Sequence, residues 1–277
     1  TMMMLLRKQH VRRISVDDAA AIDGYGCQIQ AKIPLVGKDD MSRNAIHVLW
    51  KKQSSWACFL DGSSLSEWAL SRQRITKAAQ NGHLAVIEWF HRFALQNDQS
   101  CSETAMNRAA QNGHLFVVEW LHANRPEGCS TEAMNKAAQN GHLSVVEWLH
   151  ANRSEGCTTT AMSMAARDGH LSVVEWLHAN RSEGCTTYAM DGAARNGHMS
   201  MVEWLQAKRF EGCTPSAMDN AASNRHLSVV EWLHVNRLEG CTKNAMDNAA
   251  RNGHLNVVEW LHANRSEGCT KNAMDCA

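Results

Sequence analysis

Cysteine and histidine are the side chains of this sequence best suited to binding a metal or transferring a proton, and the chain holds 10 cysteines and 15 histidines. Seven of the cysteines recur at a regular interval: Cys101, Cys129, Cys157, Cys185, Cys213, Cys241 and Cys269. Structural zinc sites use pairs of closely spaced cysteines, and the sequence contains no such pair. It therefore predicts no metal site and no cofactor.

The regular spacing also argues against disulfides. Packed helices lie about 8–10 Å apart, whereas a disulfide needs Cα atoms within about 7 Å, so cysteines in neighbouring copies cannot pair. We expect them to be small buried apolar residues with free thiols. Free thiols are typical of a reducing compartment, so the sequence predicts a cytoplasmic or otherwise intracellular protein.

The histidines form two regular sets. One set closes a turn: His114, His142, His170, His198, His226 and His254. The other set follows a Trp-Leu pair: His122, His150, His178, His234 and His262. A catalytic histidine is normally singular, with one specific partner, so the repetition predicts a structural role, with hydrogen bonds to turn backbone. Motifs of a nucleophile elbow, a phosphate-binding loop or a metalloprotease helix are absent as well, and we expect no enzymatic activity in the array.

The interval behind these sets is 28 residues, as the dipeptide Ala-Met shows by starting at positions 105, 133, 161, 189, 217, 245 and 273. Periods of about 20–50 residues are typical of solenoids, in which each unit buries its apolar face against its neighbours. A divergent earlier copy begins at Ile75, and its connection to the next copy is longer, since His83 and His114 are 31 residues apart. The sequence predicts a repeat array over residues 75–277, with about seven units and a truncated eighth.

Each unit reads as two short helices joined by a turn. Thr242 can cap a first helix through its hydroxyl, and the apolar residues of that helix form one stripe: Ala245, Met246, Ala249 and Ala250. Asn252 and Gly253 end it, because both residue types tolerate the left-handed conformation. A second helix, from His254 to near Asn264, is apolar on more than one face, which is typical of a helix packed between neighbours.

The second helices carry a column of tryptophans: Trp120, Trp148, Trp176, Trp204, Trp232 and Trp260. One indole side chain can bury about 150–250 Å², whereas the alanines of the first helices leave room for large neighbours. We therefore expect the tryptophan column to form the interior spine of the array.

The segment of residues 244–258 resembles the ankyrin repeat. It reads Asn-Ala-Met-Asp-Asn-Ala-Ala-Arg-Asn-Gly-His-Leu-Asn-Val-Val, where the family pattern is Thr-Pro-Leu-His-x-Ala-Ala-x-x-Gly-His-x-x-Val-Val, and the likeness recurs over residues 75–277. The unit is shorter than the family's repeat of about 33 residues, and the missing residues fall where ankyrins carry a β-hairpin finger. The resemblance implies an all-α, helical-repeat solenoid of stacked helix-turn-helix units with shortened or absent β-hairpin fingers.

The connection between units, Asn-Arg-Ser-Glu-Gly-Cys-Thr at residues 152–158, is similar to that of the short ankyrin-like arrays expanded in oomycete and other protist proteomes. Some of those arrays are assigned to effector-type proteins. The resemblance implies a non-enzymatic scaffold for protein–protein interaction with an unidentified protein partner. The alternative is a targeting or spacing arm of a larger enzyme or effector-type protein whose catalytic part is absent from this chain.

The composition narrows the class of partner. Apolar residues make up 44% of the chain, charged residues 20%, and 28 basic residues balance 28 acidic ones. A balanced chain offers little attraction to nucleic acid, and the apolar run from Met2 to Leu6 is too short to cross a bilayer, so we expect neither as a partner. The repeated Glu and Arg, such as Glu175 with Arg181, are expected to be solvated surface charge.

Candidate contact residues are those that differ between copies while the frame repeats. They lie between Ala-Met and Ala-Ala, just before Gly-His, or at positions where other copies are polar. Similar first-helix and turn positions contact partners in ankyrin proteins, so the resemblance implies contact roles for Arg108, Lys136, Arg167, Arg195, Asn220, Asn248 and Arg251. Tyr188 and Phe210 complete a set of nine, because each stands where other copies have polar residues and exposed apolar groups can mark contact sites. Neutral drift on a solvated face explains the variation equally well.

The two ends of the chain carry further expectations. Residues 1–74 do not fit the period and form an N-terminal non-repeat region, in which the stretch 44–70 is predicted to be a degenerate helical cap. No signal peptide is visible, and an opening residue Thr1 is compatible with a natural start further upstream. At the other end no complete unit covers Trp260 and Leu261, which suggests self-association through the uncapped C-terminal repeat.

Overall fold

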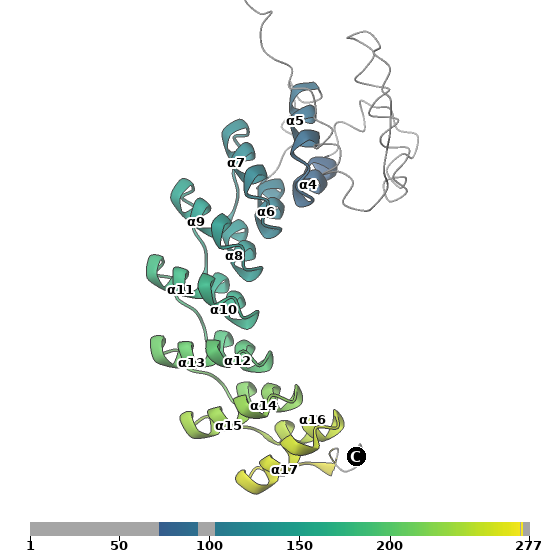
Figure 1. Ribbon diagram of the computed structural model, residues 1–277, viewed down its shortest axis with the longest axis vertical. Coiled ribbons are helices and arrows are strands. Elements are labelled where there is room, and N and C mark those ends of the chain that lie inside the picture. Colours follow the sequence, from purple (N-terminus) through teal and green to yellow (C-terminus); the bar gives the residue numbers. More distant parts are fainter. Residues whose placement is uncertain (1–71, 94–102, 272, 274–277) are drawn as a thin grey trace, which may run out of the picture. The chain divides into compact units, whose positions relative to one another are not determined.

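A computed structural model describes residues 72–93, 103–271 and 273, which belong to the second of two units into which the chain divides, Ala69–Ala277. The cap predicted within residues 44–70 lies outside these residues, and the array boundary at residue 75 stays a prediction. The described part contains fourteen α-helices and no strand (Figure 1). The helices are α4 (Arg72–Gln80), α5 (Leu84–Phe93), α6 (Glu103–Gln111), α7 (Leu115–Asn124), α8 (Thr131–Gln139), α9 (Leu143–Asn152), α10 (Thr159–Arg167), α11 (Leu171–Asn180), α12 (Tyr188–Arg195), α13 (Met199–Lys208), α14 (Ser216–Ser223), α15 (Leu227–Asn236), α16 (Lys243–Arg251) and α17 (Leu255–Asn264).

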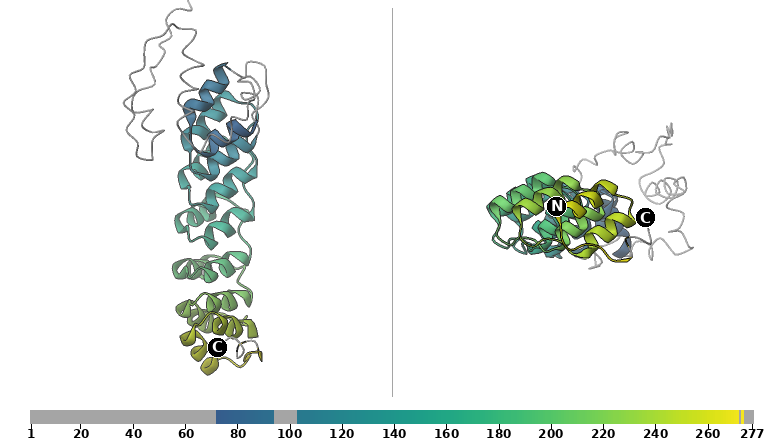
Figure 2. Two further views of the ribbon diagram at one scale, coloured as in Figure 1. Left: turned by 90° about the vertical axis from the view of Figure 1, so that its right-hand side faces the viewer. Right: turned by 90° about the horizontal axis from the view of Figure 1, so that it is seen from below.

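The helices stack in two rows. Even-numbered helices, which we call the first helices, pack each against the next even-numbered helix, and each odd-numbered second helix packs on the first helix of its own unit. Figures 1 and 2 show these units lying one on another. The prediction of an all-α solenoid of stacked helix-turn-helix units is confirmed. From α7 onward, where the structure describes the connections between units, these contain no strand and form no β-hairpin finger.

The helix boundaries follow the capping residues. Before α16, the hydroxyl oxygen of Thr242 accepts a hydrogen bond from the backbone N–H of Asn244 at 3.1 Å. After α16, Asn252 leaves the helix and Gly253 has a φ of 70°, in the left-handed region where a side chain would be strained. The helix ends predicted for this unit are confirmed.

Small and medium-sized apolar side chains fill the interior. In one unit Ala165 and Ala166 of the first helix are fully buried, as are Val173 and Val174 of the second helix, and Met162 is 2% exposed. Because alanine has only a methyl group, neighbouring first helices can approach closely, and methionine adapts its shape to the space that remains. The same pattern recurs in the other interior units.

The tryptophan column is not the interior spine, and that prediction is wrong. Trp148 is only half-buried, and its ring meets the imidazole of His122 in the preceding unit edge-on, with centroids 5.2 Å apart. The reason lies in helix periodicity. Val145, Val146 and Leu149 define the buried stripe of α9, whereas Trp148 lies at its margin beside an exposed glutamate. Tryptophan therefore joins units along the side of the array.

Candidate partner-binding surface

Each first helix buries one side against its neighbours and leaves the other side accessible. On α12, Ala189 and Ala193 are buried, whereas Tyr188 and Arg195 are exposed. We call the accessible side of the first helices and of the turns that follow them the first-helix surface. Eight of the nine predicted contact residues lie on it: Arg108, Lys136, Arg167, Tyr188, Arg195, Asn220, Asn248 and Arg251.

The predicted residues differ in accessibility. Arg108, Tyr188, Arg195 and Arg251 are exposed, and the other four residues of the first-helix surface are half-buried. Phe210 lies apart from them, on the connection between α13 and α14, where its side chain is 91% exposed and the guanidinium of Arg209 lies 5.5 Å from its ring centroid. The structure therefore gathers eight candidates on one row of helices and leaves Phe210 on another part of the unit.

Two positions of each first helix act as neighbours on this surface. Arg108 donates a hydrogen bond to Gln111 at 2.7 Å, and Arg251 donates one to Asn248 at 3.0 Å. Lys136 donates in the same way to Gln139 at 3.0 Å. Residues three apart on a helix face the same direction, so a base at either position reaches the same part of the surface.

Arg167 has the most elaborate surroundings of the candidates. Its guanidinium forms an ion pair with Asp168, with Nη2 and Oδ2 2.7 Å apart. Hydrogen bonds to Asp168 and to Tyr188 of the next unit raise the pKa of the guanidinium, and the pKa of the Asp168 carboxyl is lowered by the same pair. A Cβ at Gly192 would lie 2.7 Å from Cγ of Arg167, so the glycine leaves room for the arginine stem.

Some variable residues, which the sequence suggested as surface contacts, instead lie at the junctions between units. Asn135 and Asp247 are 3% and 4% exposed. The backbone N–H of Thr158, which precedes α10, donates to Oδ1 of Asn135 at 3.0 Å, and Thr270 donates in the same way to Asp247 at 2.7 Å. These residues anchor the start of the next unit, and they are too deeply placed to touch a partner.

The repeated arginines of the connections form ion pairs with a glutamate two residues later, a partner that the sequence did not suggest. They also contact a side chain of the preceding unit. Arg181 pairs with Glu183, two residues later, instead of with Glu175. In the equivalent pair, Arg265 Nε donates to Glu267 at 3.2 Å and Nη1 lies 3.2 Å from Nδ1 of His234 in the preceding unit. Both side chains are half-buried, so this pair is less solvated than expected, whereas Glu175 is exposed, as expected.

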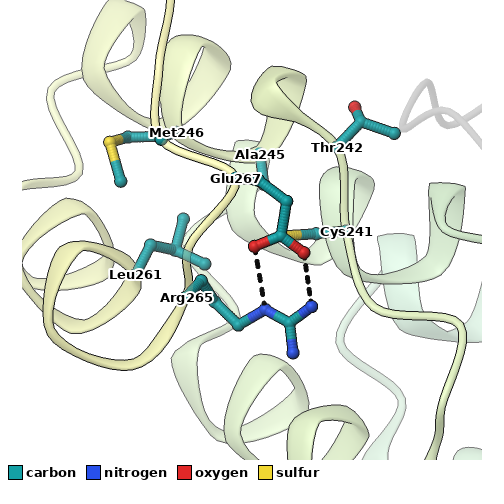
Figure 3. Close-up of a pocket in the computed structure, with 8 residues that line it drawn as sticks. Cys241, Thr242, Ala245, Met246, Leu261, Arg265 and Glu267 are labelled. Carbon is teal, nitrogen blue, oxygen red and sulfur yellow. Dashed lines mark hydrogen bonds and ion pairs between the residues drawn. The ribbon is translucent and has the colours of Figure 1, made fainter.

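Figure 3 shows the Arg265–Glu267 pair beside Cys241 of the preceding unit. The hydrogen bond from Arg265 holds the pKa of Glu267 below its ordinary value. The hollow that these residues line together with Thr242, Met246 and Leu261 is too narrow to admit a ligand. The pair therefore joins two units and is not a binding pocket.

The cysteines beside these ion pairs are buried, as predicted: Cys129, Cys157, Cys185, Cys213 and Cys241. Burial raises the pKa of each of these five thiols to about 11. They are therefore protonated at neutral pH, which makes them poor nucleophiles and poor metal ligands. Cys269 is exposed, and Cys101 lies outside the described residues.

The histidines that close the turns bond to backbone, as predicted, but the acceptor belongs to the preceding unit. Nε2 of His114 lies 3.1 Å from the carbonyl oxygen of Gln80, and Nε2 of His254 lies 3.1 Å from that of Ser223. Burial lowers the pKa of His142 in this set, which favours a neutral ring. These histidines connect units and are not arranged around a common centre.

Among the described residues, no group of three histidine, cysteine, aspartate or glutamate side chains is placed to hold a metal ion. None of the described helices has the length and apolar character needed to cross a membrane.

The fold and this surface define a class of protein, the helical-repeat proteins whose stacked units display one accessible row of helices. Comparison with known families shows which family of helical-repeat proteins this is. The family model described as "Ankyrin repeats (3 copies)" matches residues 75–156 and 134–217, and the model described as "Ankyrin repeats (many copies)" matches residues 218–262. These matches cover most of the chain, which belongs to the ankyrin-repeat family. No curated protein matches the sequence.

Proposed function

We propose that the array is a non-enzymatic scaffold that binds one partner protein on the first-helix surface. Ankyrin repeats are protein–protein interaction modules. The observation that carries the proposal is the division within each first helix: its buried alanines and methionine recur from unit to unit, while exposed positions such as Tyr188 and Arg195 vary. A constant frame with a variable accessible side is what a specific recognition surface needs.

The mechanism is rigid display. Buried alanines, junction hydrogen bonds and the Arg–Glu pairs hold the first helices in place before a partner arrives. Binding to a preformed surface orders few additional side chains, so less of the interaction free energy is lost to conformational entropy. Tyr188 is suited to a central role, because its large ring is 41% exposed.

Affinity capture with the whole chain followed by mass spectrometry tests this proposal. The capture is repeated with Tyr188→Ala and Arg195→Ala on the first-helix surface, with Phe210→Ala on the connection, and with Glu231→Ala on the second helix α15 as a matched exposed control. A partner should be lost with the first-helix variants and kept with Glu231→Ala, while circular dichroism shows unchanged helix content. Retention of every partner by the first-helix variants would refute the proposal.

Self-association is a second proposal, which one observation favours. Leu255 of α17 is 67% exposed, whereas the equivalent Leu171 and Leu227 are half-buried. A second copy of the chain would cover Leu255. Sedimentation velocity over a range of concentrations tests this: Leu255→Gln should abolish any dimer, and a chain that stays monomeric at all concentrations rules the idea out.

A further inference from the structure

The first-helix surface carries a row of positive charges that the balanced composition conceals. Each of seven units contains an eight-residue segment that runs from its buried methionine, or from Ile75 in the first unit, to the residue before the turn histidine. Each of these segments holds one basic residue. The bases are Lys77, Arg108, Lys136, Arg167, Arg195, Arg225 and Arg251. We call this set the basic row.

The position of the base shifts between units while its presence does not. Arg108 lies at the earlier of the two neighbouring helix positions described above, and Arg195 lies at the later one. In the unit of α14 those positions are occupied by Asn220 and Ser223, and the base comes two residues later, as Arg225. The unit that lacks a base on its helix thus carries one in its turn.

Arg225 has this place in spite of an unfavourable backbone. Its φ is 66°, and it is the only residue other than glycine with a positive φ in the described part of the chain. The equivalent Gly197 has a φ of 73°, and a Cβ there would lie 2.5 Å from the ring of His226 in the next unit. A strained side chain kept where other units have glycine points to a role for that side chain.

The acidic residues of the same segments do little to neutralise the row. Asp191, Asp219 and Asp247 accept hydrogen bonds at the junctions between units, and only Asp168 lies beside a base, Arg167. The balancing charge lies on the second helices, where six glutamates are exposed: Glu119, Glu147, Glu175, Glu203, Glu231 and Glu259. The two helix rows are therefore oppositely charged.

We infer that the basic row binds an extended acidic segment of a partner protein, with a carboxylate about every third residue. This inference rests on the proposed function and names the chemistry of its partner. Stacked helices repeat at about 8–10 Å, and three residues of an extended chain span about 10 Å, so successive carboxylates reach successive units. The regular spacing of the row therefore selects the pattern of acidic residues as well as their charge.

A nucleic acid fits this row less well. Its phosphates follow one another at about 3.4 Å along a strand. One basic side chain per repeat unit would therefore leave roughly two of every three phosphates without a partner. The exposed glutamates of the second helices would also repel so dense a polyanion. The spacing and the charge distribution both favour a polypeptide.

The test uses the whole chain and fluorescence anisotropy with a labelled 20-residue peptide, about the length needed to span the row, that has glutamate at every third position and serine elsewhere. A peptide of the same composition with its glutamates in one block is the control. We expect the spaced peptide to bind at least about fivefold more tightly, and its affinity to fall about tenfold or more when salt rises severalfold, because the contacts are exposed ion pairs.

Two matched variants locate the contact. Arg195→Gln with Arg225→Gly removes two charges from the basic row, and Lys208→Gln with Lys271→Gln removes two exposed charges elsewhere. The first pair should weaken binding of the spaced peptide about tenfold, and the second pair less than about twofold. Arg225→Gly alone should weaken binding while making the chain more resistant to urea, since it relieves the positive φ. Misfolding therefore cannot imitate the expected result.

Four results would overturn the inference: equal binding of the two peptides, equal losses in the two variants, tighter binding of a thymidine 20-mer, or salt-sensitive association of the chain with itself in place of peptide binding. A partner from the capture experiment that is lost with Tyr188→Ala but kept with Arg195→Gln/Arg225→Gly would remove the acidic partner and leave the proposed function standing.

Discussion

The junctions between units in the N-terminal half of the array and those in the C-terminal half use different chemical groups to accept the same backbone hydrogen bond. In the six junctions from α6 onward, a side chain of one first helix accepts a hydrogen bond from the backbone N–H of the residue that begins the next unit. The earlier junctions use the neutral residues Asn107, Asn135 and Ser163, with N···O distances of 3.1, 3.0 and 3.1 Å. The later junctions use Asp191, Asp219 and Asp247, at 2.8, 2.7 and 2.7 Å.

The second hydrogen bond of each junction explains why both chemistries work. Asn135 donates its Nδ2 to the hydroxyl oxygen of Thr158, whereas Asp219 accepts the hydroxyl of Thr242 at 2.6 Å. A threonine hydroxyl can donate or accept, so the same partner suits an amide and a carboxylate. Charge-assisted hydrogen bonds are shorter and stronger. One backbone frame can therefore hold its units together with neutral or with charged hydrogen-bond acceptors.

Removing the acceptor should have the largest effect on this comparison. Asp219→Ala deletes two short bonds to Thr242 and should cost about 2–3 kcal/mol, whereas Ser163→Ala deletes one bond of 3.1 Å and one contact of 3.4 Å and should cost about 1 kcal/mol. Urea denaturation followed by circular dichroism measures both. Glu231→Ala, at an exposed position, is the control and should change stability by less than about 0.5 kcal/mol. Equal costs for Asp219→Ala and Ser163→Ala would show that charge adds nothing at these junctions.

The repeat frame could be predicted from the sequence, because its signals are local and recur. Thr242 before a stripe of alanines and Gly253 after it define a helix without knowledge of its neighbours. The junction role of Asn135 could not be found in this way, because it depends on a threonine 23 residues further along the chain. Variation at that position suggested an exposed surface, whereas it reflects interchangeable hydrogen-bonding groups.

The errors for Trp148 and Arg181 have related causes. Residue size suggested an interior place for the indole, but which side of a helix is buried depends on its angular position relative to the valines. Arg181 and Glu175 were both expected to be solvated surface charge; Glu175 is exposed, but the connection between units brings Glu183 close to Arg181. Five of the seven residues of the basic row were predicted as contact residues, but their common charge was not recognised, because a net charge averages two oppositely charged rows of helices. Counting bases per unit and per helix would have revealed it.

The buried thiols offer a local measure of the same difference between junctions. Cys241 immediately precedes Thr242, whose N–H and hydroxyl both bond to Asp219. Asp219→Ala should therefore increase the rate at which Cys241 reacts with a thiol reagent by about tenfold or more, because the unit opens more often. Cys157, at a junction held by Asn135, should react at its original rate.

Mass spectrometry after timed exposure to iodoacetamide measures both rates in one sample. Cys269 is exposed and serves as an internal reference, which should react before the five buried cysteines in every variant. Asn135→Ala is the matched variant, and it should accelerate Cys157 while leaving Cys241 unchanged. If Asp219→Ala accelerated all five buried cysteines equally, the array would open as a whole and the junctions could not be compared one by one.

The smallest expected effect concerns pH and the half-buried Asp191. Burial raises the pKa of its carboxyl above the ordinary value, against the hydrogen bonds from Thr214 that lower it. The folded state then binds a proton more tightly than the unfolded state. The resulting stability is fully present below the unfolded pKa and is lost as pH rises through the folded pKa.

Asp191→Asn keeps both hydrogen-bond positions, with the polarity found at Asn135, and removes this titration. The variant should gain stability relative to the natural chain as pH rises from about 3 to 7, by less than about 1 kcal/mol because Asp191 is only half-buried. Urea midpoints of the two chains at each pH give the difference, from which the titration of all other groups cancels. A difference that is constant over this range would show that the carboxylate is as well solvated in the fold as in the unfolded chain, and the two kinds of junction would then differ in bond length alone.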